Sequence, residues 1–235
     1  MLGGAAPGCY TRETLDAPTR DVFERYYRPL CELLRRHNFD GIDLDVEQKM
    51  SLPGIIRLVD ALRADFGTEF IITLAPVAAA MLAMGNMSGF DYLELEAARG
   101  SDISWYNVQF YNNWGEVAAL LPVMQALWVP EKLVVGTLTS PDNGHGYMTP
   151  AHLGQRLGVL GLAGVKHGGI MGWEYFNSTP GGLDAPWQWV EEMGKLVGSG
   201  RWTEDEVRAI REHVLESGVE EAALPKAFEY DSDSR

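Results

Sequence analysis

The chain of 235 residues has few of the features that mark the specialised classes of protein. Its two cysteines, Cys9 and Cys31, are too few for a disulfide scaffold and fit no metal-ligand spacing, so we predict two free thiols. It has no run of eighteen or more apolar residues that could span a bilayer. It also has no glycine-rich phosphate-binding fingerprint, which weakens the nucleotide-binding class.

Positive charge is also scarce. The sequence has 19 lysines and arginines against 33 aspartates and glutamates, a formal net charge of −14 and a pI near 4.7. This excess of negative charge disfavours binding to the phosphate backbone of nucleic acids or to anionic membranes. We therefore expect a neutral ligand, with no nucleic acid and no membrane as partner, and no cofactor. The N-glycosylation sequons at Asn86 and Asn177 do not indicate the cellular compartment, because such tripeptides often occur by chance.

One segment, residues 39–47, alternates acidic and apolar side chains. In a β-strand this period of two places Asp43, Asp45 and Glu47 on one face and the apolar residues on the other. Neighbouring carboxylates on that face lie about 6 to 7 Å apart. Since carboxylates this close cannot all ionise cheaply, we expect at least one pKa to rise toward neutrality. A carboxylic acid that keeps its proton near neutral pH is what general acid catalysis requires.

The segments that follow predict that this acidic face lies inside the protein. A helical stripe of apolar residues over 52–66, ended by Gly67, precedes a second strand at 70–75. The order strand, helix, strand predicts a parallel sheet covered by helices. A solvated face, a divalent metal site and an acid-catalytic site are the three interpretations, and we favour acid catalysis.

Strands and helices continue to alternate along most of the chain. We predict strands at 103–111, 133–138 and 168–173, and helices at 91–99, 114–127, 186–197 and after the cap residue Thr149. Repeated βα units of this size are typical of an α/β barrel or an open doubly wound sheet. Beyond residue 200, Thr203 and Glu206 form a capping-box pattern that predicts one accessory helix, and residues 229–235 are polar.

Several motifs together resemble glycoside hydrolase family 18, the chitinase family. Residues 40–47, Asp-Gly-Ile-Asp-Leu-Asp-Val-Glu, are similar to its acidic signature on barrel strand four. Leu2-Gly3-Gly4, Leu74-Ala75-Pro76, residues 109–112 and residues 169–173 are similar to its motifs on strands three, five, six and eight, in the expected order. The resemblance covers residues 1 to about 197 and is closest to the plant-type and fungal branch. It implies an α/β fold of the TIM-type (β/α)8 barrel.

The resemblance also implies roles for the site residues. Glu47 would be the general acid and base, and Asp45 would orient the acetamido group of the sugar, which acts as the nucleophile in this family. Asp43 would hydrogen-bond Asp45 and tune its proton. Tyr111 would bind the acetamido carbonyl, and Trp173 would form the floor on which the sugar stacks.

Further residues are implied to contact the substrate or support the site. The substrate-binding set comprises Gln109, Asn112, Asp40, Gly4 and Ala75, of which Gln109 and Asn112 also fit a supporting role. Trp105, Trp114 and Trp187 fit either further sugar subsites or the layer between strands and helices. His145 and His152 show no ligand spacing.

The first two βα units of a family barrel have no counterpart in this sequence. We therefore expect a barrel truncated to about six units, strands three to eight, over residues 1–200, and an acidic tail over 201–235. No signal peptide is visible, so the localisation stays open. A barrel without two strands has unpaired edges, which makes the activity of this form uncertain.

The leading functional hypothesis is hydrolysis of β-1,4 bonds in N-acetylglucosamine polymers by a substrate-assisted, retaining mechanism. An endo-β-N-acetylglucosaminidase acting on N-glycan cores shares the same signature. A non-catalytic sugar-binding protein is the alternative from another class, although Glu47 is present. A metal-dependent phosphotransfer site would require activity that a chelator abolishes.

Overall fold

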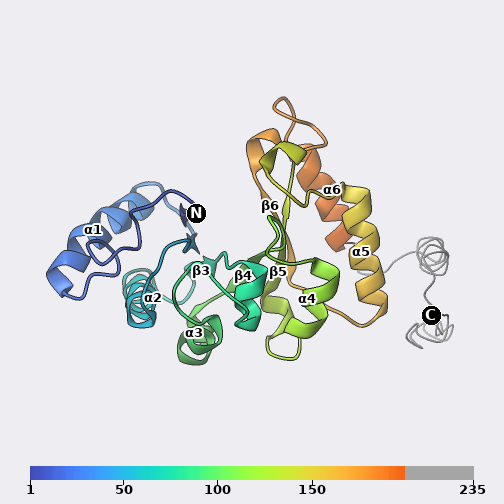
Figure 1. Cartoon of the computed structure of the whole chain (residues 1–235). Helices are drawn as coiled ribbons and strands as arrows, with labels where there is room; N and C mark the ends of the chain where they lie inside the picture. Colours follow the sequence, from blue (N-terminus) through green and yellow to red (C-terminus); the bar gives the residue numbers. More distant parts are fainter. Residues whose placement is uncertain (199–235) are drawn as a thin grey trace, which may run out of the picture. The chain divides into compact units, whose positions relative to one another are not determined.

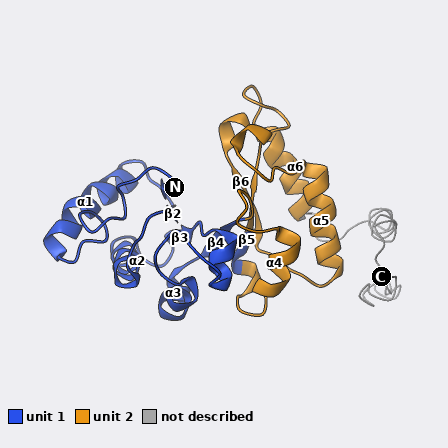
Figure 2. Ribbon diagram, viewed as in Figure 1, with its two compact units in different colours: residues 1–109, 132–134 blue, residues 110–131, 135–235 orange. Residues whose placement is uncertain are grey.

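The computed structural model describes residues 1–198. Figure 1 shows their helices and strands, coloured along the sequence. These residues belong to two compact units (Figure 2). The first unit comprises residues 1–109 and 132–134, and the second comprises residues 110–131 and, within the described part of the chain, 135–198. The predicted helix with Thr203 and Glu206 lies outside the described residues, and the predicted domain boundary near residue 200 stays a prediction.

Parallel strands with helices between them make up the first unit. Its strands are β1 (Leu2–Gly3), β2 (Gly41–Asp45), β3 (Ile71–Leu74) and β4 (Trp105–Gln109), and its helices are α1 (Arg20–Arg36), α2 (Leu52–Phe66) and α3 (Tyr92–Arg99), with 3-10 turns at Ala78–Leu82 and Gly100–Asp102. The strands are neighbours in sequence order, and all three pairings are parallel. The register places Asp43 beside Thr73 and Gly3 beside Asp45. The predicted parallel α/β arrangement is therefore confirmed.

Helix α1 has no counterpart among the predicted elements. Its buried residues, Phe23, Tyr27, Cys31 and Leu34, recur every three or four positions, which is the spacing of one helix face. This face packs on α2, where the Tyr27 hydroxyl donates to Asp65 at 2.9 Å. The stripe was readable in the sequence, but Pro29 inside the helix and the many charged residues around it obscure the signal.

The second unit contains the remaining helices and strands. They are α4 (Val117–Met124), β5 (Leu133–Leu138, whose first two residues belong to the first unit), α5 (Pro150–Leu162), β6 (Gly169–Trp173) and α6 (Trp187–Gly198), with 3-10 turns at Pro130–Lys132 (whose last residue belongs to the first unit), Pro141–Asn143 and Tyr175–Asn177. β5 is buried along its whole length, which fits its continuous apolar run. Helix α5 lies between α4 and α6 (Figure 1).

Several predicted elements are confirmed and others are longer than the observed ones. α2 begins and ends at the predicted residues because Ser51 caps its first turn and Gly67 follows its last. The strand predicted over 39–47 is limited to Gly41–Asp45, so Glu47 lies beyond it. The strand predicted over 103–111 ends at Gln109. Both cysteines are free thiols. No helix within residues 1–198 is both long and apolar enough to cross a membrane.

Candidate active site

Site residues of the first unit gather at the carboxyl ends of its parallel strands. Gly4 follows β1, Glu47 follows β2 by two residues, Ala75 follows β3 and Gln109 ends β4. Because the carboxyl ends of parallel strands meet at one edge, these residues share one end of the unit. Hydrogen bonds join them: Gly4 N–H donates to the Asp45 carbonyl at 2.8 Å, and the Gln109 side chain donates to the Ala75 carbonyl at 2.9 Å.

Asp43 is the half-buried first member of the acidic row and lies within β2. Its Oδ1 accepts from the Thr73 hydroxyl at 2.5 Å and from the Asn107 amide at 2.9 Å. Trp105 donates its indole N–H to Asn107, which fixes the orientation of that amide. The other oxygen of Asp43, Oδ2, is buried without a hydrogen-bond partner. Thr73 on β3 and Asn107 on β4 thus hold Asp43 through one oxygen, and the predicted hydrogen bond between Asp43 and Asp45 stays a prediction.

Asp45 is the carboxyl group whose protonation the fold perturbs most clearly in this row. The residue is 4% exposed, and its Oδ1 accepts from the Gln109 side chain at 3.2 Å. Burial, then the charges of Glu47 and Asp43, raise the pKa of Asp45 to about 7. The expectation that at least one carboxyl of the row moves toward neutrality is confirmed, and Asp45 is the residue concerned.

Glu47 lies on the half-buried segment that follows β2. The pairing of β2 with β3 ends at Leu44 and Leu74, and Ala75 N–H donates to the Leu44 carbonyl. The next residue of that strand segment is Pro76, which has no N–H to extend the ladder. The Val46 carbonyl instead accepts from the Ser88 hydroxyl at 2.7 Å. Glu47 is therefore positioned by a connecting loop as well as by its own strand.

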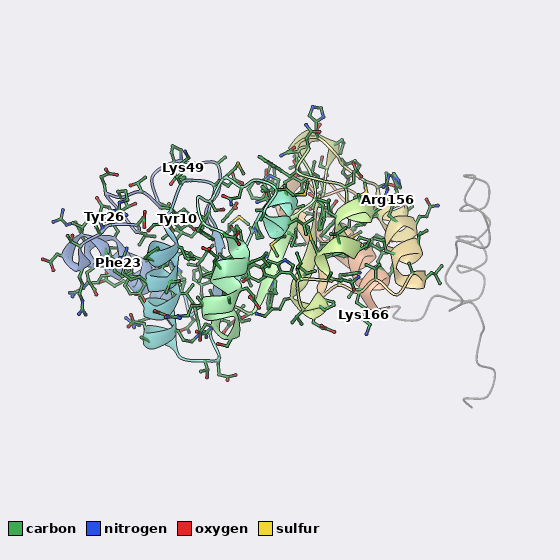
Figure 3. The ribbon with its side chains drawn as sticks, turned by 60° about the horizontal axis from the view of Figure 1, so that its bottom comes forward. Tyr10, Phe23, Tyr26, Lys49, Arg156 and Lys166 are labelled. Carbon is green, nitrogen blue, oxygen red and sulfur yellow. The ribbon has the colours of Figure 1, made fainter. Side chains whose placement is uncertain are left out.

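Tyr10 is a buried neighbour of the acidic row that the sequence pattern did not reveal. Its hydroxyl donates to the Leu2 carbonyl at 2.6 Å, and its backbone N–H donates to the side chain of Gln48 at 3.2 Å. Tyr10 thus lies beside the loop that also carries the exposed Lys49, and both residues are labelled in Figure 3. Burial raises the pKa of Tyr10 well above its ordinary value, with Cys9, Asp45 and Asp43 adding to the effect.

A positive φ and close packing explain the two glycines of the Leu2-Gly3-Gly4 motif. Gly3 has φ +96°, and a Cβ there would collide with the Asp45 carbonyl and the Tyr10 ring. Gly4 has φ +80°, and a Cβ there would lie 3.2 Å from the Asp45 carboxylate. Both positions favour glycine because L side chains rarely adopt this conformation. The motif therefore lets β1 approach Asp45 closely.

The second unit carries Tyr111, Asn112 and Trp173. Tyr111 is buried and follows β4, and Trp173 ends β6 with 36% of its surface exposed. The Trp173 carbonyl accepts from Thr139 N–H at 2.9 Å and from the Asn143 side chain at 3.0 Å, so its backbone is held by the segment after β5. The peptide bond from Trp173 to Glu174 is cis.

Asn112 is hydrogen-bonded to a loop of its own unit. Its backbone N–H donates to the His145 carbonyl at 2.8 Å, and its side-chain oxygen accepts from His145 N–H at 2.9 Å. A Cβ at Gly144 would collide with the Asn112 amide, so the loop packs closely against this residue. The supporting interpretation of Asn112 fits these contacts better than direct substrate binding.

Other predicted residues lie away from this end of the strands. Asp40 is exposed and precedes β2, so the structure does not bring it to Glu47. Trp105 begins β4 and lines a cavity of about 510 Å³ together with Asp43, Ile71 and Thr73. This cavity is at the amino ends of the strands, which separates Trp105 from the predicted sugar subsites.

Three other residues of the second unit considered in the sequence are Trp114, Trp187 and His152. Trp187 begins α6 and is 51% exposed, and Trp114 is half-buried before α4. His152 accepts from the Arg156 guanidinium at 3.1 Å, and Arg156 also pairs with Glu116 at 3.5 Å. Arg156 is labelled in Figure 3. Within residues 1–198, no three His, Cys, Asp or Glu side chains are grouped as metal ligands.

Parallel βα units with an acidic row at the carboxyl ends of their strands define an enzyme of the (β/α)8-barrel class. Solved structures similar to the chain include two fungal enzymes. A fungal endo-β-N-acetylglucosaminidase from glycosyl hydrolase family 18 is 44% identical, with a TM-score of 0.79 over 83% of this chain and 69% of its own. The chitinase ChiC from Aspergillus fumigatus is 55% identical, with a TM-score of 0.72 over 82% of this chain and 69% of its own.

The chain belongs to glycoside hydrolase family 18. Among curated proteins, endochitinase 4 from Metarhizium anisopliae is 24% identical over 222 residues, which are 77% of this chain and 71% of that protein. The chain spans 56% to 64% of the length of further endochitinases. No family model matches the chain. The predicted barrel-type fold and the predicted family are confirmed.

Proposed function

We propose that this chain hydrolyses β-1,4 glycosidic bonds in chitin or chitooligosaccharides, with retention of configuration and with the acetamido group of the substrate as nucleophile. The observation that carries the proposal is the acidic row that ends in Glu47, in which burial and neighbouring charges raise the pKa of Asp45 to about 7. A neutral polysaccharide suits a chain with a net charge of −14, because it brings no phosphate or carboxylate to be repelled.

Glu47 is the general acid of the proposed reaction. It donates a proton to the glycosidic oxygen as the bond to the leaving sugar breaks, and it later accepts a proton from the attacking water. A retaining glycosidase with an enzymic nucleophile needs a second carboxylate about 5 Å from the acid. In family 18 the carbonyl oxygen of the N-acetyl group takes that role, so the attack forms an oxazolinium intermediate.

Asp45 and Asp43 support the charge that develops on the substrate. Below pH 7 Asp45 carries a proton for most of the time, which limits repulsion inside the buried row. Transfer of this proton leaves a carboxylate that orients the acetamido N–H and stabilises the positive oxazolinium ion. The unpartnered Oδ2 of Asp43 is an acceptor available to that proton. Thr73 and Asn107 hold Asp43 in position through its other oxygen.

The family resemblance assigns Tyr111 and Trp173, both in the second unit, to sugar binding. The Tyr111 hydroxyl would hydrogen-bond the acetamido carbonyl oxygen, and the Trp173 ring would stack on the apolar face of the distorted sugar. Gly4, Ala75 and Gln109 act by positioning, because Gly4 packs against Asp45 and the Gln109 side chain bonds both Asp45 and the Ala75 carbonyl.

A second candidate function has a specific observation in its favour. The fungal relative that is 44% identical with a TM-score of 0.79 is an endo-β-N-acetylglucosaminidase. The same acid and the same substrate-assisted attack would cleave the N-acetylglucosamine pair of an N-glycan core. A sugar-binding protein without catalysis is less well supported, because Glu47 is retained at the end of the acidic row.

The test compares the wild-type chain with a Glu47→Gln variant on a chitin oligosaccharide and on an N-glycan core substrate. Glu47→Gln should lower turnover by roughly 100-fold or more, the range that general acid catalysis contributes, while sugar binding persists. Glu69→Gln, which changes an exposed carboxylate before β3, is the control and should keep full activity. Unchanged turnover in Glu47→Gln would refute the assignment, and the preferred wild-type substrate decides between the two hydrolases.

A further inference from the structure

The loop after β2 is held by a chain of hydroxyl groups. The Ser88 hydroxyl donates to the Val46 carbonyl at 2.7 Å, one residue before Glu47. The Tyr92 hydroxyl lies 2.8 Å from the Ser88 oxygen. Since Ser88 uses its single proton on Val46, Tyr92 is the donor to Ser88. Ser88 is 4% exposed and Tyr92 is completely buried, so water competes little for these bonds.

Ser88 also holds the loop on the other side of Glu47. Its carbonyl accepts from Met50 N–H at 2.7 Å. The next residue, Gly89, has φ +84°, and a Cβ there would lie 2.9 Å from the Lys49 Cα and 3.0 Å from the Met50 backbone. The segment that carries Glu47 is therefore hydrogen-bonded to Ser88 through Val46 and Met50. Its end, at Lys49 and Met50, packs against Gly89.

The residues that supply these bonds are themselves fixed. The Tyr92 ring lies 4.9 Å from that of Phe90 and 6.2 Å from that of Tyr106, measured between centroids. Asp91 caps the helix that begins at Tyr92 by accepting from Leu93 N–H at 2.7 Å. The turn from residue 86 to 90 is closed by Asn86, which bonds both Gly89 and Phe90. The anchor of the loop is thus built on α3 and its capping turn.

From this geometry we propose that Ser88, supported by Tyr92, is a positioning residue for the general acid Glu47. The inference rests on the proposed function, because it assigns Ser88 no contact with the sugar. An acid must meet the glycosidic oxygen at hydrogen-bond distance, and a displacement of about 1 Å can cost roughly 100-fold in rate. β2 ends at Asp45, so the position of Glu47 depends on the bonds that its loop makes.

The test uses the Ser88→Ala variant and two substrates that differ in their need for an acid. In a chitin oligosaccharide the leaving group is a sugar alkoxide, which must be protonated as it departs. In a 4-nitrophenyl chitooligosaccharide the leaving group is a stable phenolate, which departs without a proton. Ser88→Ala should lower kcat on the oligosaccharide by roughly 10- to 100-fold with KM nearly unchanged. The loss on the nitrophenyl substrate should be less than about threefold. Ser88→Thr, which keeps the hydroxyl, should recover much of the lost rate.

A matched control separates positioning from simple destabilisation. Ser104→Ala removes another hydroxyl of the first unit, one that accepts from Ile72 N–H at 3.3 Å at the amino end of β3, and should leave kcat unchanged on both substrates. If Ser88→Ala folds poorly, Tyr92→Phe removes the supporting donor without changing the ring and should give a smaller loss with the same substrate dependence.

Two results would overturn this role for Ser88. One is an equal loss of kcat on both substrates in Ser88→Ala and Tyr92→Phe, and the other is no loss at all in variants that fold. If Glu47→Gln is inactive while Ser88→Ala has wild-type kcat, the role of Ser88 fails and the proposed function stands. If Glu47→Gln turns over like the wild type, the proposed function fails, and this inference fails with it.

Discussion

Replacing Asp45 with asparagine should stabilise the protein near neutral pH while lowering its activity. Burial and the charges of Glu47 and Asp43 raise the pKa of Asp45 from 3.8 to about 7, so the folded state binds more protons than the unfolded state in this window. The stability of the wild type should therefore fall as the pH rises from about 4 to about 7 and then level off.

The size of this effect follows from the width of the window. Each pH unit over which one group differs in protonation corresponds to about 1.4 kcal/mol at 25 °C. The interval from 3.8 to about 7 therefore amounts to up to about 4 kcal/mol. Asparagine stays neutral at every pH in this range, and its amide oxygen can still accept from Gln109, whose donor lies 3.2 Å from Asp45 Oδ1.

The assay is urea unfolding of the wild type and Asp45→Asn at pH 4, 6 and 8, together with turnover of a chitin oligosaccharide. The variant should gain most at pH 8 and little at pH 4, and its turnover should fall at every pH. Asp40→Asn, which changes an exposed carboxylate at the other end of β2, should show no such pH-dependent gain. A free-energy difference between Asp45→Asn and wild type that is the same at pH 4 and pH 8 would refute the reasoning.

Two further predictions concern the sugar site and the alternative chemistry. Trp173→Ala should raise KM roughly tenfold, because the lost stacking is worth about 1.4 kcal/mol. Trp173→Phe should keep most of the affinity, and an unchanged KM in the alanine variant would remove Trp173 from the site. Incubation with EDTA should leave turnover unchanged, since the proposed mechanism uses carboxyl groups and the substrate itself. A loss that added Mg²⁺ or Mn²⁺ restores would favour the metal-dependent interpretation.

Local signals in the sequence predicted several elements to the residue. α2 has an apolar stripe, a serine cap at Ser51 and Gly67 after its last turn, and β5 is a continuous apolar run over Leu133–Leu138. Each of these signals depends on residues a few positions apart. α1 was missed although its buried face recurs at helical spacing, because Pro29 and several arginines stand among those positions.

Other features depended on contacts that no local pattern contains. Asp43 is held by bonds to Thr73 and Asn107, which are 30 and 64 residues away from it in the sequence. The strand predicted to reach Glu47 stops at Asp45, because its pairing with β3 ends at Leu44 and its pairing with β1 ends at Asp45. Ser88 gave no signal of its own, since its bond to Val46 spans 42 residues.

The sequence by itself determined that Asp43 and Asp45 would share one face of a strand, because the alternation of side chains in a strand is a property of consecutive residues. It also contained the family motifs and their order. The tertiary structure alone decided that Asp45 has its pKa raised to about 7, and that the loop of Glu47 is bonded to Ser88. Burial, charge and hydrogen bonds act between groups that are close in space, and these groups come from strands and turns far apart in the chain.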